Sequence, residues 1–121
     1  MQERILICGS REWKNFYIIK KFLEPLEKDT IIIHGGCRGA DTIAGYLAKQ
    51  LGLEVIVFKA NWEIDGKSAG PKRNQKMLDE GKPTKVIAFH EDIENSKGTK
   101  DMVTRAKNSN LEVEIIPLFT E

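Results

Sequence analysis

The sequence predicts a three-layer α/β domain in which a five-stranded parallel sheet carries helices on both faces. Two observations favour this class. Five short apolar runs, rich in Ile, Val or Phe, alternate along the chain with segments of helical periodicity. Within each run the apolar residues are continuous, which is typical of strands covered on both faces. The predicted strands are Arg4–Cys8, Thr30–His34, Glu54–Phe58, Lys85–Phe89 and Glu112–Pro117.

Helical segments fill the intervals between the predicted strands. Their apolar residues recur at three- and four-residue spacing, the period of a helix that buries one face. Pro25 is expected to end or kink the first helix near Glu24, and Gly52 and Gly81 stand where the second and third helices should stop. The third helix is predicted to be short. The marker residues are Ile18, Ile19, Phe22, Leu23 and Leu26, then Ile43, Leu47 and Leu51, then Met77 and Leu78, and last Met102, Val103 and Ala106.

The alternation of strands and helices also predicts the topology. Right-handed crossovers between parallel strands favour the strand order 3-2-1-4-5. In such a Rossmann-like sheet the chain reverses direction between strands 1 and 4, and a ligand crevice opens above their carboxyl ends. The length of 121 residues fits one domain, so we expect residues 1–121 to form a single unit.

The composition restricts the classes of partner. The formal net charge is only +1, which gives no support to broad binding of nucleic acid or of a membrane surface. Phosphate recognition should therefore be local. Two cysteines and no signal-peptide segment favour a reducing, cytoplasmic location. No apolar run approaches the ~20 residues that span a bilayer. His34 and His90 lack partners at metal-ligand spacing, so neither a metal nor a cofactor is expected.

A glycine-rich turn joins the second strand to the second helix. Gly35, Gly36 and Gly39 would let the backbone turn tightly and approach a ligand, and the following helix N-terminus favours an anion. Arg38 could add a charge-assisted bond to phosphate. The alternative is a plain turn with Asp41 as a charge at the helix N-terminus. The spacing matches neither a Walker A loop nor a GxGxxG fingerprint.

Two further polar turns follow the first and the fourth strands. Each could contact phosphate, and each could instead be an ordinary turn with a surface arginine or a helix cap. Because both should face the same crevice, the pair carries more information than either alone. The residues are Gly9, Ser10 and Arg11 after the first strand, and Ser96, Gly98 and Thr99 after the fourth.

The connection from the third strand to the third helix, Ala60 to Asn74, is long for a loop, and long loops are often functional. Trp62 could stack on a base or could pack as a lid over the sheet edge. Arg73 and Asn74 are expected in the first turn of the third helix, within reach of the crevice. The candidate ligand-binding residues here are Asn61, Trp62, Lys67, Arg73 and Asn74.

Three other features have plain interpretations. His34 is expected to orient the glycine-rich turn, and Cys37 to fill space beside it. The charged run Glu91–Glu94 is expected to be a solvated loop.

Taken together, these motifs resemble the YspA/YpsA-like branch of the SLOG superfamily from about Ile5 to Val113. That superfamily is Rossmann-like and includes the LOG phosphoribohydrolases and the DNA-processing DprA/Smf proteins. The resemblance implies binding of nucleotides or of derivatives such as ADP-ribose-type molecules. It rests on GSR, HGGxRGAD, ANW, GKxAGPxRN and SxGT with Asp and Met shortly after, which are residues 9–11, 34–41, 60–62, 66–74, 96–99 and 101–102.

The resemblance also assigns roles and shows departures. Arg73 and Asn74 resemble the arginine-bearing helix of the LOG enzymes, and Gly98 and Thr99 resemble the end of their PGGxGTxxE motif. The catalytic Glu of those enzymes is replaced here by Met102. The Pro-Gly-Gly opening is replaced by residues 94–96. These differences argue against phosphoribohydrolase activity and leave ligand binding intact.

Three functions remain open at this stage. The first is a module that senses, sequesters or carries a nucleotide-derived, phosphate-bearing ligand, with homo-oligomerisation through its helices expected. The second is an N-glycoside hydrolase, in which Asp101 or Asp41 stabilises positive charge on the ribose and Arg73 positions the substrate. The third, disfavoured by the net charge, is single-stranded DNA handling. It would need a basic stripe of Arg38, Lys67, Lys72, Arg73 and Lys97.

Overall fold

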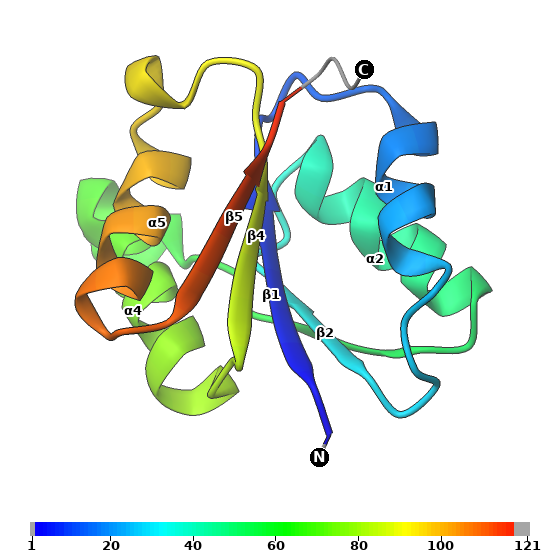
Figure 1. Ribbon diagram of the computed structural model, residues 1–121. Coiled ribbons are helices and arrows are strands. Elements are labelled where there is room, and N and C mark those ends of the chain that lie inside the picture. The colour runs from blue at the N-terminus through cyan, green and yellow to red at the C-terminus, as the bar shows by residue number, and fades with distance from the viewer. Residues whose placement is uncertain (1, 118–121) are drawn as a thin grey trace.

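Five parallel strands form the centre of the protein, in the order β3-β2-β1-β4-β5 (Figure 1). The structure is a computed structural model, and it describes residues 2–117. Strand order and direction confirm the predicted topology. The strands are β1 Arg4–Gly9, β2 Ile31–His34, β3 Glu54–Val57, β4 Lys85–Phe89 and β5 Glu112–Ile116.

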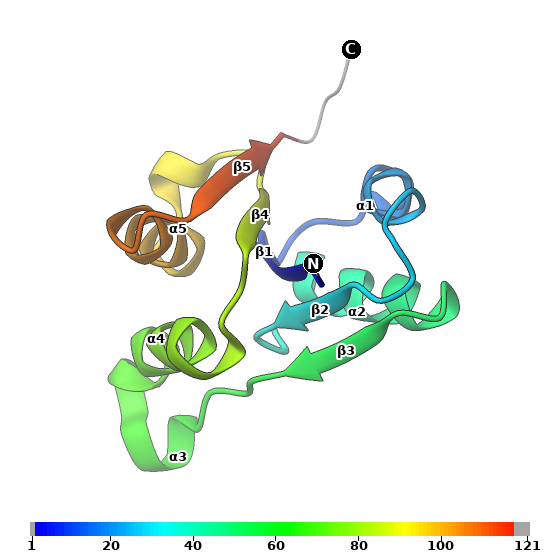
Figure 2. The ribbon, with the colours of Figure 1, turned by 60° about the horizontal axis from the view of Figure 1, so that its bottom comes forward.

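Helices cover both faces of the sheet, as predicted (Figure 2). Helices α1, Phe16–Leu23, and α2, Ala40–Gln50, lie on one face. Helices α4, Ala69–Gly81, and α5, Gly98–Asn108, lie on the other. The short helix α3 and the two 3-10 turns η1 and η2 span Trp62–Asp65, Gly66–Ser68 and Ile93–Asn95. Between residues 2 and 117, no helix combines the length and the apolar character that crossing a bilayer requires.

Alternate residues of the central strands enter two separate cores. Ile5 and Ile7 of β1 pack with α1 and α2, whereas Leu6 and Cys8 pack with α4 and α5. Because both faces are covered, every position of β1 between Ile5 and Cys8 is buried. This burial explains the continuous apolar runs in the sequence.

The connection from β3 to α4 differs from the prediction. Residues 60–74 are not a long loop, because α3 and η1 occupy its middle and α4 begins at Ala69. The third long helix is therefore not short: α4 has 13 residues, and Arg73 lies in its second turn. Pro71 fits this earlier start, because a proline in the first helical turn leaves no hydrogen bond unmade. The Asn61 side chain caps α3 by accepting the N–H of Ile64 (3.2 Å).

The C-terminal end of α4 also differs slightly from the prediction that Gly81 stands where the helix stops. Gly81 is the last helical residue, and Lys82 takes the left-handed conformation at φ 48° instead. Gly81 serves packing: a Cβ there would lie 3.3 Å from Cδ1 of Ile33 on the sheet. The glycine thus lets the helix approach the strands closely.

The parallel topology brings the N-termini of α2, α4 and α5 to the carboxyl edge of the sheet. The partial positive charge of each helix N-terminus is therefore directed toward that edge. Gly39, at φ 81°, makes the turn into α2 and lies against the carbonyl oxygens of Ser10 and Arg11. The turn after β1 and the glycine-rich turn after β2 are thus held together by backbone contact, including the hydrogen bond from the N–H of Ala40 to the carbonyl oxygen of Ser10 (3.0 Å).

A pair of glycine substitutions tests this contact. Gly39 and Gly52 have nearly the same φ, 81° and 82°, but a Cβ at Gly52 would meet nothing within 4 Å. Gly52→Ala should cost about 1–2 kcal/mol in unfolding free energy for its left-handed backbone. Gly39→Ala should cost about 3 kcal/mol or more, because ψ −128° places Gly39 outside the left-handed helical region and because its Cβ also overlaps two backbone carbonyls. Urea unfolding measures both. Equal losses would show that the contact with the Ser10–Arg11 turn is unimportant.

Candidate ligand-binding site

A cavity of about 630 Å³ opens at the carboxyl edge of the sheet, between the end of β1 and the first turns of α4 and α5. We call it the first lobe. Gly9 and Ser10 line it from β1, Gly70 and Pro71 from α4, and Gly98 and Thr99 from α5. The apolar part of its wall is formed by Cys8, Met77 and Met102. This position is the crevice that the strand order predicts.

A second cavity of about 400 Å³, the second lobe, adjoins the first. It lies around the glycine-rich turn and the segment that follows β3. Four residues line both lobes and form the boundary between them: Arg11, Cys37, Trp62 and Arg73. The two lobes therefore belong to one site.

The structure gathers most of the predicted site residues around these lobes. Two are not in the lining: Asn61 caps α3, and Gly39 packs on the backbone of the first polar turn. The first lobe is lined by Gly9, Ser10, Arg11, Asp41, Trp62, Lys67, Arg73, Asn74, Ser96, Gly98, Thr99 and Asp101, and the second lobe adds Gly35, Gly36 and Arg38.

The glycine-rich turn is held by hydrogen bonds within the protein. Oδ2 of Asp41 accepts the N–H groups of Gly35 (3.0 Å) and Cys37 (3.3 Å). The intervening N–H of Gly36 donates to Nδ1 of His34 (3.0 Å), which confirms that His34 orients the turn. These three amides are thus unavailable to a ligand. Asp41 is a buried acceptor for the turn and not a plain charge at the helix N-terminus.

Burial shifts the pKa values of the two side chains that hold the turn, and it shifts them in opposite directions. Burial raises the pKa of the Asp41 carboxyl from 3.8 to about 6, against the effect of its two backbone hydrogen bonds. Burial and the charge of Lys49 lower the pKa of His34 from 6.5 to about 4. The imidazole is therefore neutral at pH 7, as its role of acceptor at Nδ1 requires.

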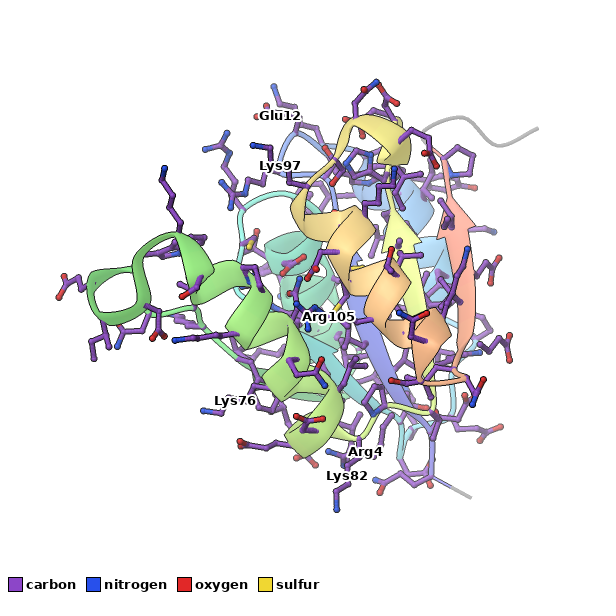
Figure 3. The ribbon with its side chains drawn as sticks, turned by 90° about the vertical axis from the view of Figure 1, so that its left-hand side faces the viewer. Arg4, Glu12, Lys76, Lys82, Lys97 and Arg105 are labelled. Carbon is purple, nitrogen blue, oxygen red and sulfur yellow. The ribbon has the colours of Figure 1, made fainter. Side chains whose placement is uncertain are left out.

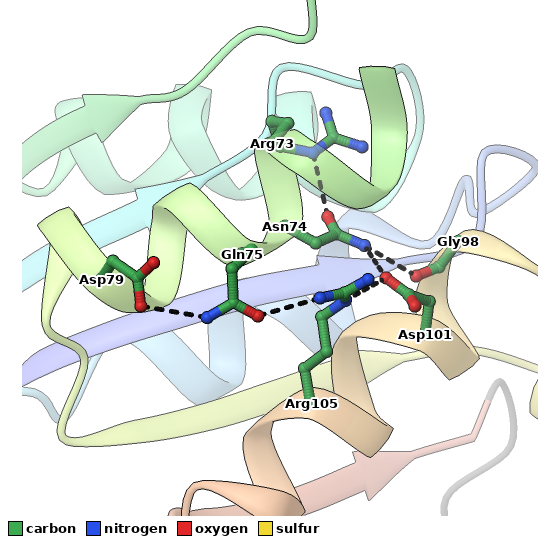
Figure 4. Close-up of polar contacts among 7 residues, drawn as sticks. All are labelled: Arg73, Asn74, Gln75, Asp79, Gly98, Asp101 and Arg105. Carbon is green, nitrogen blue, oxygen red and sulfur yellow. Dashed lines mark hydrogen bonds and ion pairs between the residues drawn. The ribbon is translucent and has the colours of Figure 1, made fainter. Parts of the chain in front are cut away.

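Arg73 and Asn74 connect the glycine-rich turn to the N-terminus of α5 (Figure 4). Nη1 of Arg73 donates to the carbonyl oxygen of Gly35 (2.7 Å), and its Nε donates to Oδ1 of Asn74 (2.9 Å). Nδ2 of Asn74 donates in turn to the carbonyl oxygen of Gly98 (3.3 Å) and to Oδ2 of Asp101 (3.0 Å). The Gly35 and Gly98 turns therefore converge on one site. We call this chain of bonds the Arg73–Asn74 bridge.

Asp101 is held from a second side. Its Oδ2 also accepts Nε–H of Arg105 (2.9 Å), one turn further along α5. Nη1 of Arg105 donates to Oε1 of Gln75 on α4 (2.8 Å), so the pair ties the two helices together. The charge of Asp101 is thus compensated within the protein.

Ser10 is likewise engaged. Its hydroxyl donates to Oε1 of Glu91 (2.9 Å) and accepts the N–H of Glu12 (3.0 Å). Glu91 is therefore not part of a merely solvated run, because it fixes the turn that follows β1. The proximity arises from the pairing of β1 with β4, which places Gly9 beside Phe89.

Unpaired cations surround the first lobe. Arg11, Lys67 and Lys97 are exposed, line the lobe and have no ion pair or side-chain hydrogen bond within residues 2–117. The carboxylates of the lobe are Asp41 and Asp101, and both accept hydrogen bonds from the protein. With Arg73, four cations and two carboxylates line the lobe, so its lining carries an excess of positive charge although the chain is nearly neutral.

Space for a ligand lies over the N-terminus of α5. A Cβ built on Gly98 would meet no atom within 4 Å, and no left-handed backbone calls for glycine there. The N–H of Gly98 has no partner in the described part of the chain, whereas that of Thr99 donates to Oγ of Ser96 (3.1 Å). The fold itself does not require a glycine at this position.

Sequence reasoning missed Lys59 and His90. They line the second and the first lobe, and each follows closely on a strand, β3 or β4. The rule that function gathers after strand carboxyl ends could have found both. His90 accepts the N–H of Asp92 at Nδ1 (2.9 Å), which places the imidazole proton of the neutral ring on Nε2. Across residues 2–117, no group of three or more His, Cys, Asp or Glu is arranged to hold a metal ion.

Comparison with solved structures defines the class of fold. The structure of DNA processing protein A (DprA) from Streptococcus pneumoniae matches with a TM-score of 0.79 at 20% sequence identity. The match covers 95% of this chain and 50% of that chain, so the protein spans half the length of this relative. The fold is therefore the Rossmann-like fold of DprA.

Sequence comparison then defines the family. The model of the YspA, cpYpsA-related SLOG family matches residues 3–64. The Gene 61 protein of Mycobacterium phage D29 is 34% identical in an alignment 119 residues long, which covers 91% of this chain and 93% of that protein. The chain belongs to the YspA, cpYpsA-related SLOG family, which confirms the resemblance seen in its motifs and indicates nucleotide-related binding or processing.

The opposed pKa shifts give a prediction for Asp41→Asn. Between pH 3.8 and about 6 the folded protein binds more protons at Asp41 than the unfolded chain does, so this group's contribution to stability falls as pH rises. His34 makes the opposite contribution between about pH 4 and 6.5, and it remains in the variant. The substitution should therefore cost about 2 kcal/mol more unfolding free energy at pH 4 than at pH 7.

Urea unfolding at the two pH values measures this difference. Asp29→Asn is the control, because Asp29 is exposed and its carboxylate makes no hydrogen bond or ion pair in the described structure. Its cost should be the same at both pH values. A pH-independent cost for Asp41→Asn would contradict the raised pKa of the buried carboxyl.

Proposed function

We propose that the protein binds a nucleotide-derived, phosphate-bearing ligand in the first lobe, as a sensing, sequestering or carrier module. One observation carries the proposal: the unpaired cations Arg11, Lys67 and Lys97 ring a lobe whose carboxylates are already engaged. A local excess of positive charge in a chain of net charge +1 fits a small anionic ligand better than an extended polyanion.

The phosphate would lie at the N-terminus of α5. The unpartnered N–H of Gly98 and the partial positive charge of the helix favour an anion there. Lys97 and Lys67 line the same lobe and can supply charge-assisted bonds. The open space over Gly98 lets a phosphate reach the backbone.

The remainder of the ligand would occupy the apolar part of the lobe. Met77 and Met102 line it beneath the polar rim, and Trp62 lies at the boundary with 52% of its surface exposed. An exposed indole next to a cavity offers a face on which a base can stack. This combination of polar rim and apolar wall is what a nucleoside requires.

Catalysis is the less favoured alternative. A hydrolase would need a carboxylate free to stabilise charge on the ribose, and Asp101 and Asp41 both accept hydrogen bonds from the protein. Arg73, the positioning residue of that hypothesis, is used by the bridge. Chromatographic detection of free base from nucleotides, lost in Asp101→Asn, would establish hydrolysis instead of binding.

DNA handling is the other alternative, because the fold neighbour is named as a DNA processing protein. Salt-sensitive binding of an oligonucleotide in preference to mononucleotides would favour it.

The proposal predicts the behaviour of a double variant, Lys67→Gln with Lys97→Gln. Removing two cations from the rim should weaken the binding of adenosine monophosphate and of ADP-ribose by about tenfold or more, because charge-assisted hydrogen bonds to phosphate are stronger than hydrogen bonds between neutral groups. Calorimetric titration measures the dissociation constants. Lys76→Gln is the matched control, since Lys76 is exposed on α4 toward the other end of the molecule from Lys97 (Figure 3).

The control variant should bind as the unaltered protein does. If no member of a panel of nucleotides and ADP-ribose derivatives binds, or raises the melting temperature at millimolar concentration, the proposed function is wrong.

Gly98→Ala separates binding from folding. The added methyl group would enter open space, so the unfolding free energy should stay within about 0.5 kcal/mol of the original or rise, since alanine is the better helix former. Nucleotide affinity should fall by about tenfold because the methyl blocks the approach of phosphate to the backbone. Unfolding and titration are measured on the same sample. Retained affinity would place the phosphate elsewhere.

A further inference from the structure

The charged side chains that line the second lobe are all positive. Its ionisable Arg, Lys, Asp and Glu residues are all cations: Arg11, Arg38, Lys59 and Arg73. No carboxylate lines it among the described residues. Arg38 already pairs with Glu12, and Arg73 donates to the carbonyl oxygen of Gly35. Arg11 and Lys59 have no ion pair or side-chain hydrogen bond within residues 2–117, so these two cations are the ones that an anion in the lobe would pair with first.

Lys59 is placed to serve this lobe. The stem of its side chain runs along the glycine-rich turn, since a Cβ built on Gly36 would lie 3.2 Å from Cγ and 3.7 Å from Cε of Lys59. Its ammonium group has no ion pair within residues 2–117. Packing of the stem against the turn restricts the side chain before any ligand arrives, which lowers the entropic cost of a contact.

Arg38 is available at small cost. It pairs with Glu12 at 2.8 Å, but 72% and 67% of the two side chains are exposed. Exposed pairs of this kind contribute about 0–1 kcal/mol, so an anion in the lobe can compete for the guanidinium.

The second lobe is separated from the phosphate position proposed above. The Arg73–Asn74 bridge spans the interval between the carbonyl groups of Gly35 and Gly98. Two side chains thus stand between the N-terminus of α5 and the glycine-rich turn. An anion held at Gly98 leaves Lys59 without an ion-pair partner in the described residues, and Arg38 with Glu12 alone.

We infer that the second lobe is a distinct anion subsite, and that the ligand is a nucleotide bearing a second phosphate outside its first phosphate chain. This inference rests on the proposed function, because it takes the first lobe as the site of the first phosphate. The residues shared by the two lobes, above all Trp62 and Arg73, would contact the part of the ligand that joins its phosphates.

The test compares adenosine 5′-monophosphate with adenosine 3′,5′-bisphosphate by calorimetric titration. The bisphosphate should bind about tenfold more tightly, as one additional charge-assisted contact implies. Lys59→Gln should remove that advantage and change the affinity for the monophosphate by less than about twofold. Arg38→Gln should reduce the advantage in part, and Lys59→Arg should preserve it. Lys76→Gln again serves as the control.

The outcomes separate the two proposals. If the monophosphate binds and the bisphosphate binds no more tightly, or if Lys59→Gln weakens both equally, the second subsite is wrong and the proposed function stands. If neither nucleotide binds, the second subsite is wrong as stated, and the panel of nucleotides and ADP-ribose derivatives decides separately whether the proposed function is wrong too. If a short single-stranded oligonucleotide binds more tightly than the bisphosphate and only its affinity depends on Lys59, the lobes follow a nucleic-acid backbone and the small-molecule assignment is overturned.

Discussion

The hydrogen bond from Arg73 to the carbonyl oxygen of Gly35 is the interaction on which the site depends. It joins α4 to the turn after β2, and Asn74 extends the connection to α5. Gly35 permits the approach, since a Cβ there would lie 2.7 Å from Nη1 of Arg73. Only 9% of Arg73 is exposed, so its charge is held by partners within the protein and acts at the boundary of both lobes.

Charge is distributed so that acids hold the scaffold and cations face the ligand space. Asp41 and Asp101 stabilise the turn after β2 and the pairing of α4 with α5. Arg11, Lys67 and Lys97 are left free at the rim. A near-neutral chain therefore presents a cavity whose lining is locally positive, as the proposed binding of a small anion requires. Membership of the YspA, cpYpsA-related SLOG family agrees with a nucleotide-related ligand.

Much of this arrangement could be predicted from the sequence. The five strands, their order and the placement of glycine-containing turns at one edge follow from apolar runs and from the handedness of crossovers, which are local or topological rules. The connection before α4 could not be predicted well. Gly66, Gly70 and Pro71 read as loop residues, yet Pro71 is compatible with a first helical turn, and the caps that decide the matter are side-chain contacts.

The sequence by itself determined which residue types stand at the carboxyl edge of the sheet. The tertiary structure alone decided which of them are engaged and which are free. Arg73 meets Gly35 across 38 residues, Asn74 meets Asp101 across 27, and Ser10 meets Glu91 across 81. Such pairings depend on how helices pack on the sheet, which no local pattern encodes. The position of Lys59 after β3 could be predicted, but its contact with the glycine-rich turn depends on the pairing of β3 with β2.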